Sequence, residues 1–167
     1  MKNYLQKKLN NEKGMTLIEL LAVIVIIAII AAIAIPAIGN IIENSRYSAV
    51  KSDATNGISA ANIYFTENPD KSNVTAAQLL KDGYLDSAGE LPVTGAADSK
   101  TAGAEGVTLF TNVNPMTIDT PAIVFSGDKK VQFKGATLNG INGNTEKGSG
   151  IAANATHEVN ATPTSGD

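Results

Sequence analysis

An uninterrupted apolar run near the start of the chain constrains the fold more than any other feature of the sequence. Between Leu20 and Ile35 no polar side chain occurs, and beyond Pro36 the apolar character resumes as far as Ile42. A helix over this run would be about 34 Å long, which is enough to cross the hydrocarbon layer of a bilayer. Buried helices of soluble domains rarely lack a polar face for so long, so the run predicts a membrane-spanning helix.

A short basic segment precedes the apolar run. Residues 1–14 carry four lysines and a single glutamate, which predicts that this end faces the cytoplasm and that the C-terminal bulk of the chain lies outside. A secretory signal peptide also has a basic head, but its apolar core is shorter and a small-residue cleavage site follows it. The run in this chain is too long, and no such site stands immediately after it.

One ionisable residue, Glu19, stands at the edge of the apolar run. A charged group costs about 2.5–3.5 kcal/mol at the centre of a membrane helix on insertion scales, and less near an interface. A side chain that costs so much usually has a partner, and we expect none from its own helix. Two interpretations stay open on these residues alone: Glu19 reaches the headgroup level, or it pairs with a group outside its helix.

The sequence Gly14-Met15-Thr16-Leu17-Ile18-Glu19, between the basic leader and the apolar helix, resembles the class III signal of type IV prepilins. Pro36 falls where many members of that family have a helix-kinking proline. The resemblance covers only the N-terminal part of the chain. It is specific, because the glycine, the glutamate at a fixed distance from it and the apolar run must all coincide.

This resemblance implies a processing and assembly pathway. A prepilin peptidase would cleave between Gly14 and Met15, the new amine of Met15 would be N-methylated, and the product would polymerise into a thin filament. In that family the glutamate that corresponds to Glu19 is thought to pair with the N-terminal amine of a neighbouring subunit, which favours pairing over the headgroup interpretation. Because either charge would be costly if buried alone, such a pair sets the register of subunits more than it adds net stability.

The net charge of −3 over 167 residues conceals an asymmetry along the chain. Four of the 13 basic residues and one of the 16 acidic residues lie within residues 1–14, so the chain from residue 15 onward carries a net charge of −6. No Lys/Arg cluster remains in it. Direct binding of nucleic acid is therefore not predicted.

The chain contains no cysteine. This excludes disulfides, thiolate metal sites and a cysteine nucleophile, so an exported domain must be held by packing alone. Many Gram-negative type IV pilins have a C-terminal disulfide loop. Its absence favours a Gram-positive-type pilin or a secretion pseudopilin.

The helix is expected to continue beyond Ile42 as an amphipathic helix. Apolar residues recur at intervals of three and four, the helical period, at Tyr47, Val50, Ala54, Ile58, Ala61 and Phe65. This stripe predicts docking onto a globular head. Pro36 cannot donate a backbone hydrogen bond and, with Gly39, predicts a kink or an unwound turn that would matter in assembly. Asn68-Pro69-Asp70 predicts the end of the helix.

A second, short helix is expected after this turn. Thr75 is the candidate N-cap and Gln78 would complete a capping box, with Val74 and Leu79 at the positions of a hydrophobic staple. Gly83 then supplies the C-terminal stop. Residues 86–106 are rich in Gly, Ala, Ser and Asp and predict a surface loop.

Three strands are expected in the following part of the chain. They are Val107–Asn112, Thr117–Asp119 continuing into Pro121–Ser126, and Lys129–Lys134. Gly127-Asp128 suits a two-residue hairpin turn between the last two. Alternation of apolar and polar residues in the last strand predicts one buried and one wet face. Together they predict a meandering antiparallel sheet packed against the amphipathic half of the long helix.

From about Leu138 to Asp167 the chain consists mainly of Asn, Gly, Thr, Ser and Ala. It is expected to be either a decorated loop region or a disordered tail. Within it the only histidine, His157, has no second His or Cys with which to share a metal, so we expect a solvated side chain. Asn154-Ala155-Thr156 and Asn160-Ala161-Thr162 match the N-glycosylation triplet, as does Asn73-Val74-Thr75, but in a bacterial context the triplet is weak evidence.

No catalytic or cofactor-binding constellation is present in the sequence. Secretion pseudopilins often bind calcium in their sheet loops, and four acidic residues could contribute to such a site, although no Asp-x-Asp-x-Asp loop occurs. They are Asp98, Glu105, Asp119 and Asp128. Phosphate-binding glycine loops and nucleophile elbows are also missing from the sequence. We therefore predict no enzymatic activity, no cofactor and no metal site.

The predicted fold is α+β, with a long N-terminal helix, half apolar and half amphipathic, packed on a small antiparallel sheet, as in the type IV pilin fold that the resemblance implies. The expected segments are a cleaved leader at 1–14, an apolar transmembrane and filament-core helix at 15–42, the amphipathic half at 43–67, a globular head at 68–137 and a polar C-terminal region at 138–167.

Three functions compete on these observations. The first is a pilin that polymerises into a type IV pilus for adhesion, motility, aggregation or DNA uptake; its long polar C-terminal region favours it. The second is a pseudopilin of a type II secretion or competence system, and the third is a single-pass membrane anchor for a small binding domain. The implied partners are other copies of the chain, the prepilin peptidase and methyltransferase, the pilus assembly platform, minor pilins and, before assembly, the membrane. The precursor would lie in the cell membrane and the product in an extracellular filament (fimbrium).

Overall fold

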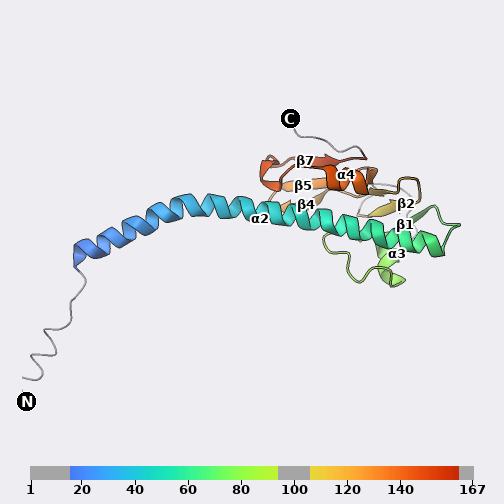
Figure 1. The fold of residues 1–167 in the computed structure, drawn as a ribbon, viewed down its shortest axis with the longest axis horizontal. Coiled ribbons are helices and arrows are strands. Elements are labelled where there is room, and N and C mark those ends of the chain that lie inside the picture. The colour runs from blue at the N-terminus through green and yellow to red at the C-terminus, as the bar shows by residue number, and fades with distance from the viewer. Residues whose placement is uncertain (1–15, 94–105, 162–167) are drawn as a thin grey trace, which may run out of the picture. The chain divides into compact units, whose positions relative to one another are not determined.

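The structure is a computed structural model that describes residues 16–93 and 106–161. The chain divides into two compact units, Met1–Gly39 and Asn40–Asp167, and each is described by itself. Helix α2 (Leu17–Glu67) contributes its first half to the first unit and its second half to the second unit (Figure 1).

The described part of the first unit consists of the apolar half of α2. The large apolar side chains all point outward: the isoleucines, leucines and valines from Leu17 to Ile42 are each at least 47% exposed. By length and composition α2 is able to cross a membrane. The helix is continuous through Pro36 and Gly39.

In the second unit, α2 buries one face against the rest of the head. Its buried residues are Tyr47, Val50, Ala54, Gly57, Ile58, Ala60, Ala61, Tyr64 and Phe65. This confirms every position of the predicted stripe. The helix ends at Glu67, where the backbone and side-chain N–H groups of Asn68 both donate to the carbonyl of Tyr64 and Pro69 follows.

In the described part of the chain, seven short strands form two sheets. The first sheet has the order β1 (Asn73–Thr75), β2 (Leu109–Thr111), β3 (Thr117–Asp119) and β6 (Ala136–Thr137), with every pair antiparallel. The second has the order β4 (Ile123–Ser126), β5 (Lys129–Phe133) and β7 (Thr156–Val159) (Figure 1). Helix packing on mainly antiparallel sheets confirms the α+β class and matches the type IV pilin fold.

The prediction of one meandering sheet was wrong, because the chain changes sheets at Thr120. This fully buried residue donates its backbone N–H to the carbonyl of Phe133 and accepts a bond on its hydroxyl from the Phe133 N–H. Pro121, which has no N–H, follows it. The expected strand from Thr117 to Ser126 is therefore two strands, β3 and β4, in different sheets.

The predicted hairpin of β4 and β5 is present. The strands pair antiparallel across Gly127, which has the positive φ of 53° that such a turn requires. A register irregularity lies between Val124 and Ser126. In β5, Val131 and Phe133 are fully buried and Lys130 is exposed, as the alternation predicted.

The short helix α3 (Ala76–Lys81) begins at the predicted cap. The hydroxyl of Thr75 accepts from the N–H of Gln78 at 3.2 Å. The side chain of Gln78 donates to Asp82 instead of turning back to the cap, so the structure shows one of the two bonds of a capping box. Gly83 ends the helix with φ +79°.

The expectation of a loop or disordered tail after Leu138 was wrong for the residues described. They form helix α4 (Leu138–Gly143), a 3₁₀ turn (Gly148–Gly150) and strand β7, which runs parallel to β5. Helix α4 is capped in the same way as α3, since the Thr137 hydroxyl accepts a hydrogen bond from the N–H of Gly140. A parallel pair needs a long crossover, and the polar stretch between β5 and β7 supplies it.

An ion pair holds the start of the head to α2. The ammonium of Lys129, at the hairpin turn, lies 2.8 Å from the carboxylate of Glu43, and both side chains are at most one-quarter exposed. The hydroxyl of Ser126 also donates to Glu43, and Asn44 accepts from the backbone N–H of Ser149. The hairpin and the 3₁₀ turn are thus bound to the same turn of the helix.

Gly57 marks a close approach of α2 to the first sheet. A Cβ at this position would lie 2.6 Å from the ring of Phe110, which is fully buried at the centre of β2. Real Cβ atoms do not approach carbon so closely, and the ring has no open space into which to move.

We predict that Gly57→Val destabilises the head by about 1–3 kcal/mol, because the added atoms overpack the core against Phe110. The measurement is urea unfolding of the full chain in detergent. Ser59→Val, on the exposed side of the same helix, is the matched control and should change the unfolding free energy by less than about 1 kcal/mol. Equal effects of the two substitutions would contradict the packing argument.

Candidate processing and assembly site

The predicted cleavage site, Gly14 and Met15, lies outside the described residues. Thr16, the first residue that the structure describes, is the second residue after the expected scissile bond. The geometry of this site therefore concerns the first turn of α2, where the new N-terminus would be created.

Thr16 and Glu19 form a reciprocal capping box at the start of α2. The backbone N–H of Thr16 donates to Oε2 of Glu19 at 2.7 Å, and the N–H of Glu19 donates to the Thr16 hydroxyl at 3.3 Å. The hydroxyl itself donates to the same Oε2 at 2.8 Å. Two orphan N–H groups of the first turn are thereby satisfied, and a carboxylate is placed at the positive end of the helix dipole.

The expectation that Glu19 has no partner in its own helix was therefore wrong. The pattern Thr-x-x-Glu before an apolar run is a capping-box signature that can be recognised in the sequence. The bond from Thr16 depends on the peptide N–H between residues 15 and 16, which cleavage after Gly14 leaves intact. Both bonds from Thr16 end on Oε2, and Oε1 accepts no hydrogen bond from the described residues.

Pro36 and Gly39, predicted to mark a kink or an unwound turn, both lie within the continuous α2. Proline removes the backbone bond to the carbonyl of Ala32, which in hydrocarbon is costly to leave unpaired. A Cβ built on Gly39 would meet nothing within 4 Å. A larger side chain would therefore fit at this position in the single chain. The role of these two residues in assembly stays a prediction.

The comparison with protein families decides what this segment is. Residues 9–35 match the model of the prokaryotic N-terminal methylation motif. The chain carries this motif, the class III signal of type IV pilins. Searches of the curated proteins and of the solved structures found no match to the chain.

The motif supports a type IV pilin-like or pseudopilin protein, and its family is structural rather than enzymatic. It implies processing by a prepilin peptidase and pilus assembly in general. Together with the exposed apolar half of α2, it fits a membrane-anchored precursor.

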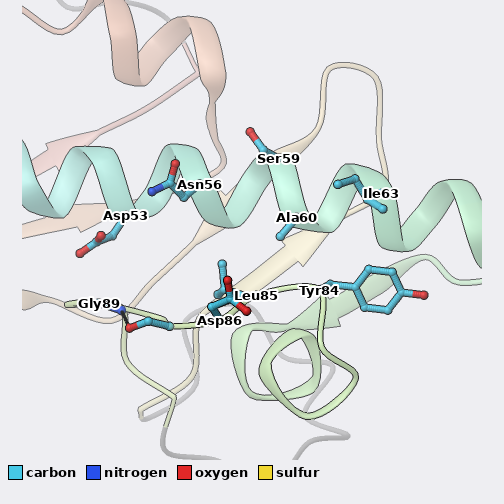
Figure 2. A pocket seen from close by; sticks show the side chains of 10 residues that line it. Asp53, Asn56, Ser59, Ala60, Ile63, Tyr84, Leu85, Asp86 and Gly89 are labelled. Carbon is cyan, nitrogen blue, oxygen red and sulfur yellow. Dashed lines mark hydrogen bonds between the residues drawn. The ribbon is translucent and has the colours of Figure 1, made fainter.

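An open groove of about 430 Å³ lies in the head and is lined by no residue of the methylation motif. One wall is the polar face of α2, with Asp53, Asn56 and Ser59, and the other is the segment from Tyr84 to Gly89 (Figure 2). Asp53 holds the two walls together, because its Oδ2 accepts from the N–H of Glu90 at 2.9 Å.

The acidic residues considered for calcium do not form a site in the described part of the chain. Asp98 and Glu105 lie outside the described residues, and Asp119 accepts a bond from the N–H of Gly135. Among residues 16–93 and 106–161, no three His, Cys, Asp or Glu side chains are placed to hold a metal ion.

We predict that Thr16→Val weakens the first turn of α2 by about 1 kcal/mol, because the hydroxyl that caps the N–H of Glu19 is lost. Amide hydrogen exchange of Glu19 in the detergent-bound chain should then be faster by about fivefold. Thr16→Ser keeps the hydroxyl and is the matched control. Identical exchange in the two variants would show that the hydroxyl does not cap the helix.

Proposed function

We propose that this chain is the structural subunit of a type IV pilus and polymerises through the apolar half of α2. The observation that carries the proposal is the methylation motif at residues 9–35 at the start of a helix that exposes every leucine, isoleucine and valine from Leu17 to Ile42. A prepilin peptidase would cleave between Gly14 and Met15, and the methylated amine of Met15 would become the N-terminus of the filament subunit.

The apolar half of α2 requires an apolar environment in both states of the chain. Moving one large aliphatic side chain out of water is favourable by about 1.5–3 kcal/mol. In the single chain, every leucine, isoleucine and valine from Leu17 to Ile42 is at least 47% exposed. Such a surface is stable only in a bilayer or against other chains. In our proposal the bilayer covers it in the precursor and neighbouring helices cover it in the filament.

Glu19 sets the register between subunits in this proposal. Its Oε2 is bound by Thr16 of the same chain, and its second oxygen is available for the N-terminal amine of a neighbouring subunit. A carboxylate accepts several hydrogen bonds, so the two partners do not compete. Because an unpaired charge in the apolar filament core would be costly, only the register that brings amine and carboxylate together is stable.

Two alternatives remain beside the pilus subunit. A pseudopilin of a secretion or competence system has the same motif and the same helix, so the motif alone does not separate the two. An anchored binding domain would use the head, and the open groove beside Asp53 favours it. We propose no enzymatic activity, no cofactor and no direct contact with nucleic acid.

The proposal is tested by mass spectrometry of the N-terminal peptide from filaments sheared off the cell surface. A peptide that begins at Met15 with one added methyl group is the expected result. Finding only the full chain from Met1, and only in membranes, would support the anchored domain instead. Methylated chain that never leaves the cell envelope would favour the pseudopilin.

We predict that Gly14→Leu blocks processing, so that the precursor with its leader accumulates in the membrane and no filaments form. The measurement is the mass of the N-terminal peptide from the membrane fraction. Gly39→Ala is the control: it also adds a side chain to a glycine, but in open space beyond the cleavage site, and should be processed normally. Cleaved Gly14→Leu chain would place the cleavage site elsewhere.

We predict that Glu19→Ala is still cleaved before Met15 but yields at least tenfold fewer filaments, because the amine of each incoming subunit is left unpaired; loss of one partner of a buried pair costs about 3–5 kcal/mol. Filament mass per cell and the N-terminal peptide are both measured. Glu19→Gln keeps the shape and the bond from Thr16 but removes the charge, and should also assemble poorly. Normal assembly of Glu19→Gln would exclude a role for the charge.

A further inference from the structure

The single histidine of the chain is built into a polar cluster that docks the last described strand onto α2. The cluster joins Tyr47 of α2, Asn144 after α4 and His157 of β7. The Tyr47 hydroxyl donates to Oδ1 of Asn144 at 3.0 Å, and Nδ2 of Asn144 lies 3.0 Å from Nε2 of His157. The rings of Tyr47 and His157 also meet edge to face, with their centroids 6.1 Å apart. The expectation of a solvated tail histidine was therefore wrong.

The hydrogen bonds of this cluster specify the protonation state of His157. A phenol with an ordinary pKa near 10 is protonated at neutral pH, so Tyr47 donates and Asn144 accepts on Oδ1. The amide nitrogen of Asn144 is only a donor. It follows that Nε2 of His157 is the acceptor and that the ring is neutral with its proton on Nδ1. A proton on Nε2 would bring two donors face to face.

The groups around the ring oppose its protonation. Burial lowers the pKa of His157 below its usual value, and the positive charge of Lys51 lowers it further, while the negative charge of Glu146 acts in the other direction. Lys51 comes from α2 and is held nearby, because its ammonium donates to the backbone carbonyl of Asn144 at 2.7 Å. Asn144 itself is almost fully buried.

We propose that His157 is a pH-sensitive latch: the neutral ring fastens strand β7 and the segment around Asn144 to α2, and protonation of the ring releases them. Strand β7 is suited to local release, since among the described strands it lies at the edge of its sheet and pairs only with β5. Its one fully buried residue is Val159. The inference concerns the head alone and does not depend on the proposed filament function.

The direction of the pH dependence follows from the lowered pKa. Between the pKa of the unfolded chain, about 6.5, and the lower pKa of the folded head, the unfolded state binds more protons. The stabilisation from the latch is therefore complete above about pH 6.5 and is lost as the pH falls toward the folded-state pKa. Within that window the equilibrium constant for docking falls by up to about tenfold per pH unit.

The first test is a nitrogen NMR titration of the full chain in detergent, labelled only in histidine. Because the chain has one histidine, its signals are unambiguous. The expected result is a neutral ring protonated on Nδ1 and a titration midpoint below 6.5. A neutral ring protonated on Nε2, or a midpoint at or above 6.5, would overturn the proposal. This measurement uses the unaltered chain and does not depend on any variant folding.

The second test is amide hydrogen exchange from pH 7.5 to pH 5, corrected for the intrinsic rate. Protection of residues 156–159 in β7 should decrease at the low end, while residues 109–111 in β2, far from the cluster in sequence and in another sheet, serve as the internal reference. His157→Gln keeps an acceptor but cannot titrate, and should show protection of β7 independent of pH. The same pH dependence in this variant, or equal loss in β2, would show that His157 is not the latch.

Discussion

The structure depends on how one helix meets two different requirements for burial. Along its first half, α2 presents large aliphatic side chains on every side, and the described part of the chain covers none of them. Along its second half it presents one apolar stripe and buries it in the core of the head. A single helix therefore needs an external apolar environment at one end and buries its apolar face within the head at the other. This is the physical basis of our proposal that the chain is first anchored and then assembled.

The same physical chemistry accounts for the two special features of the first half. A helix start in an apolar environment leaves N–H groups without water to bind, and the Thr16–Glu19 capping box satisfies two of them. The charge that satisfies them is itself costly to bury. We propose that Glu19 also binds the amine of a neighbouring chain. Because the buried charge is costly without that amine, only one register between subunits is stable. The same carboxylate then caps its own helix and fixes the position of its neighbour.

The head shows how polar residues substitute for disulfides in a chain without cysteine. The ion pair of Glu43 with Lys129 and the cluster of Tyr47, Asn144 and His157 connect α2 to segments about a hundred residues later in the chain. Both connections use partly or fully buried groups, where hydrogen bonds are stronger and unpaired partners costlier than in water. The second contains His157, and in our proposal protonation of its ring releases the connection, so that this link responds to pH in a way that a disulfide does not.

The sequence by itself determined the features that depend on local periodicity and local chemistry. The apolar run, the buried stripe from Tyr47 to Phe65, the cap at Thr75 and the β4–β5 hairpin are all present as predicted, because side-chain spacing and turn residues act over a few positions. Only the tertiary structure decided the rest. Three features depend on contacts between distant segments: the exchange of sheets at Thr120, the parallel pairing of β7 with β5 and the packing of His157 against Tyr47. Such contacts leave no periodic pattern, and in a polar stretch such as residues 138–161 the few buried side chains reveal their partners only in the folded chain.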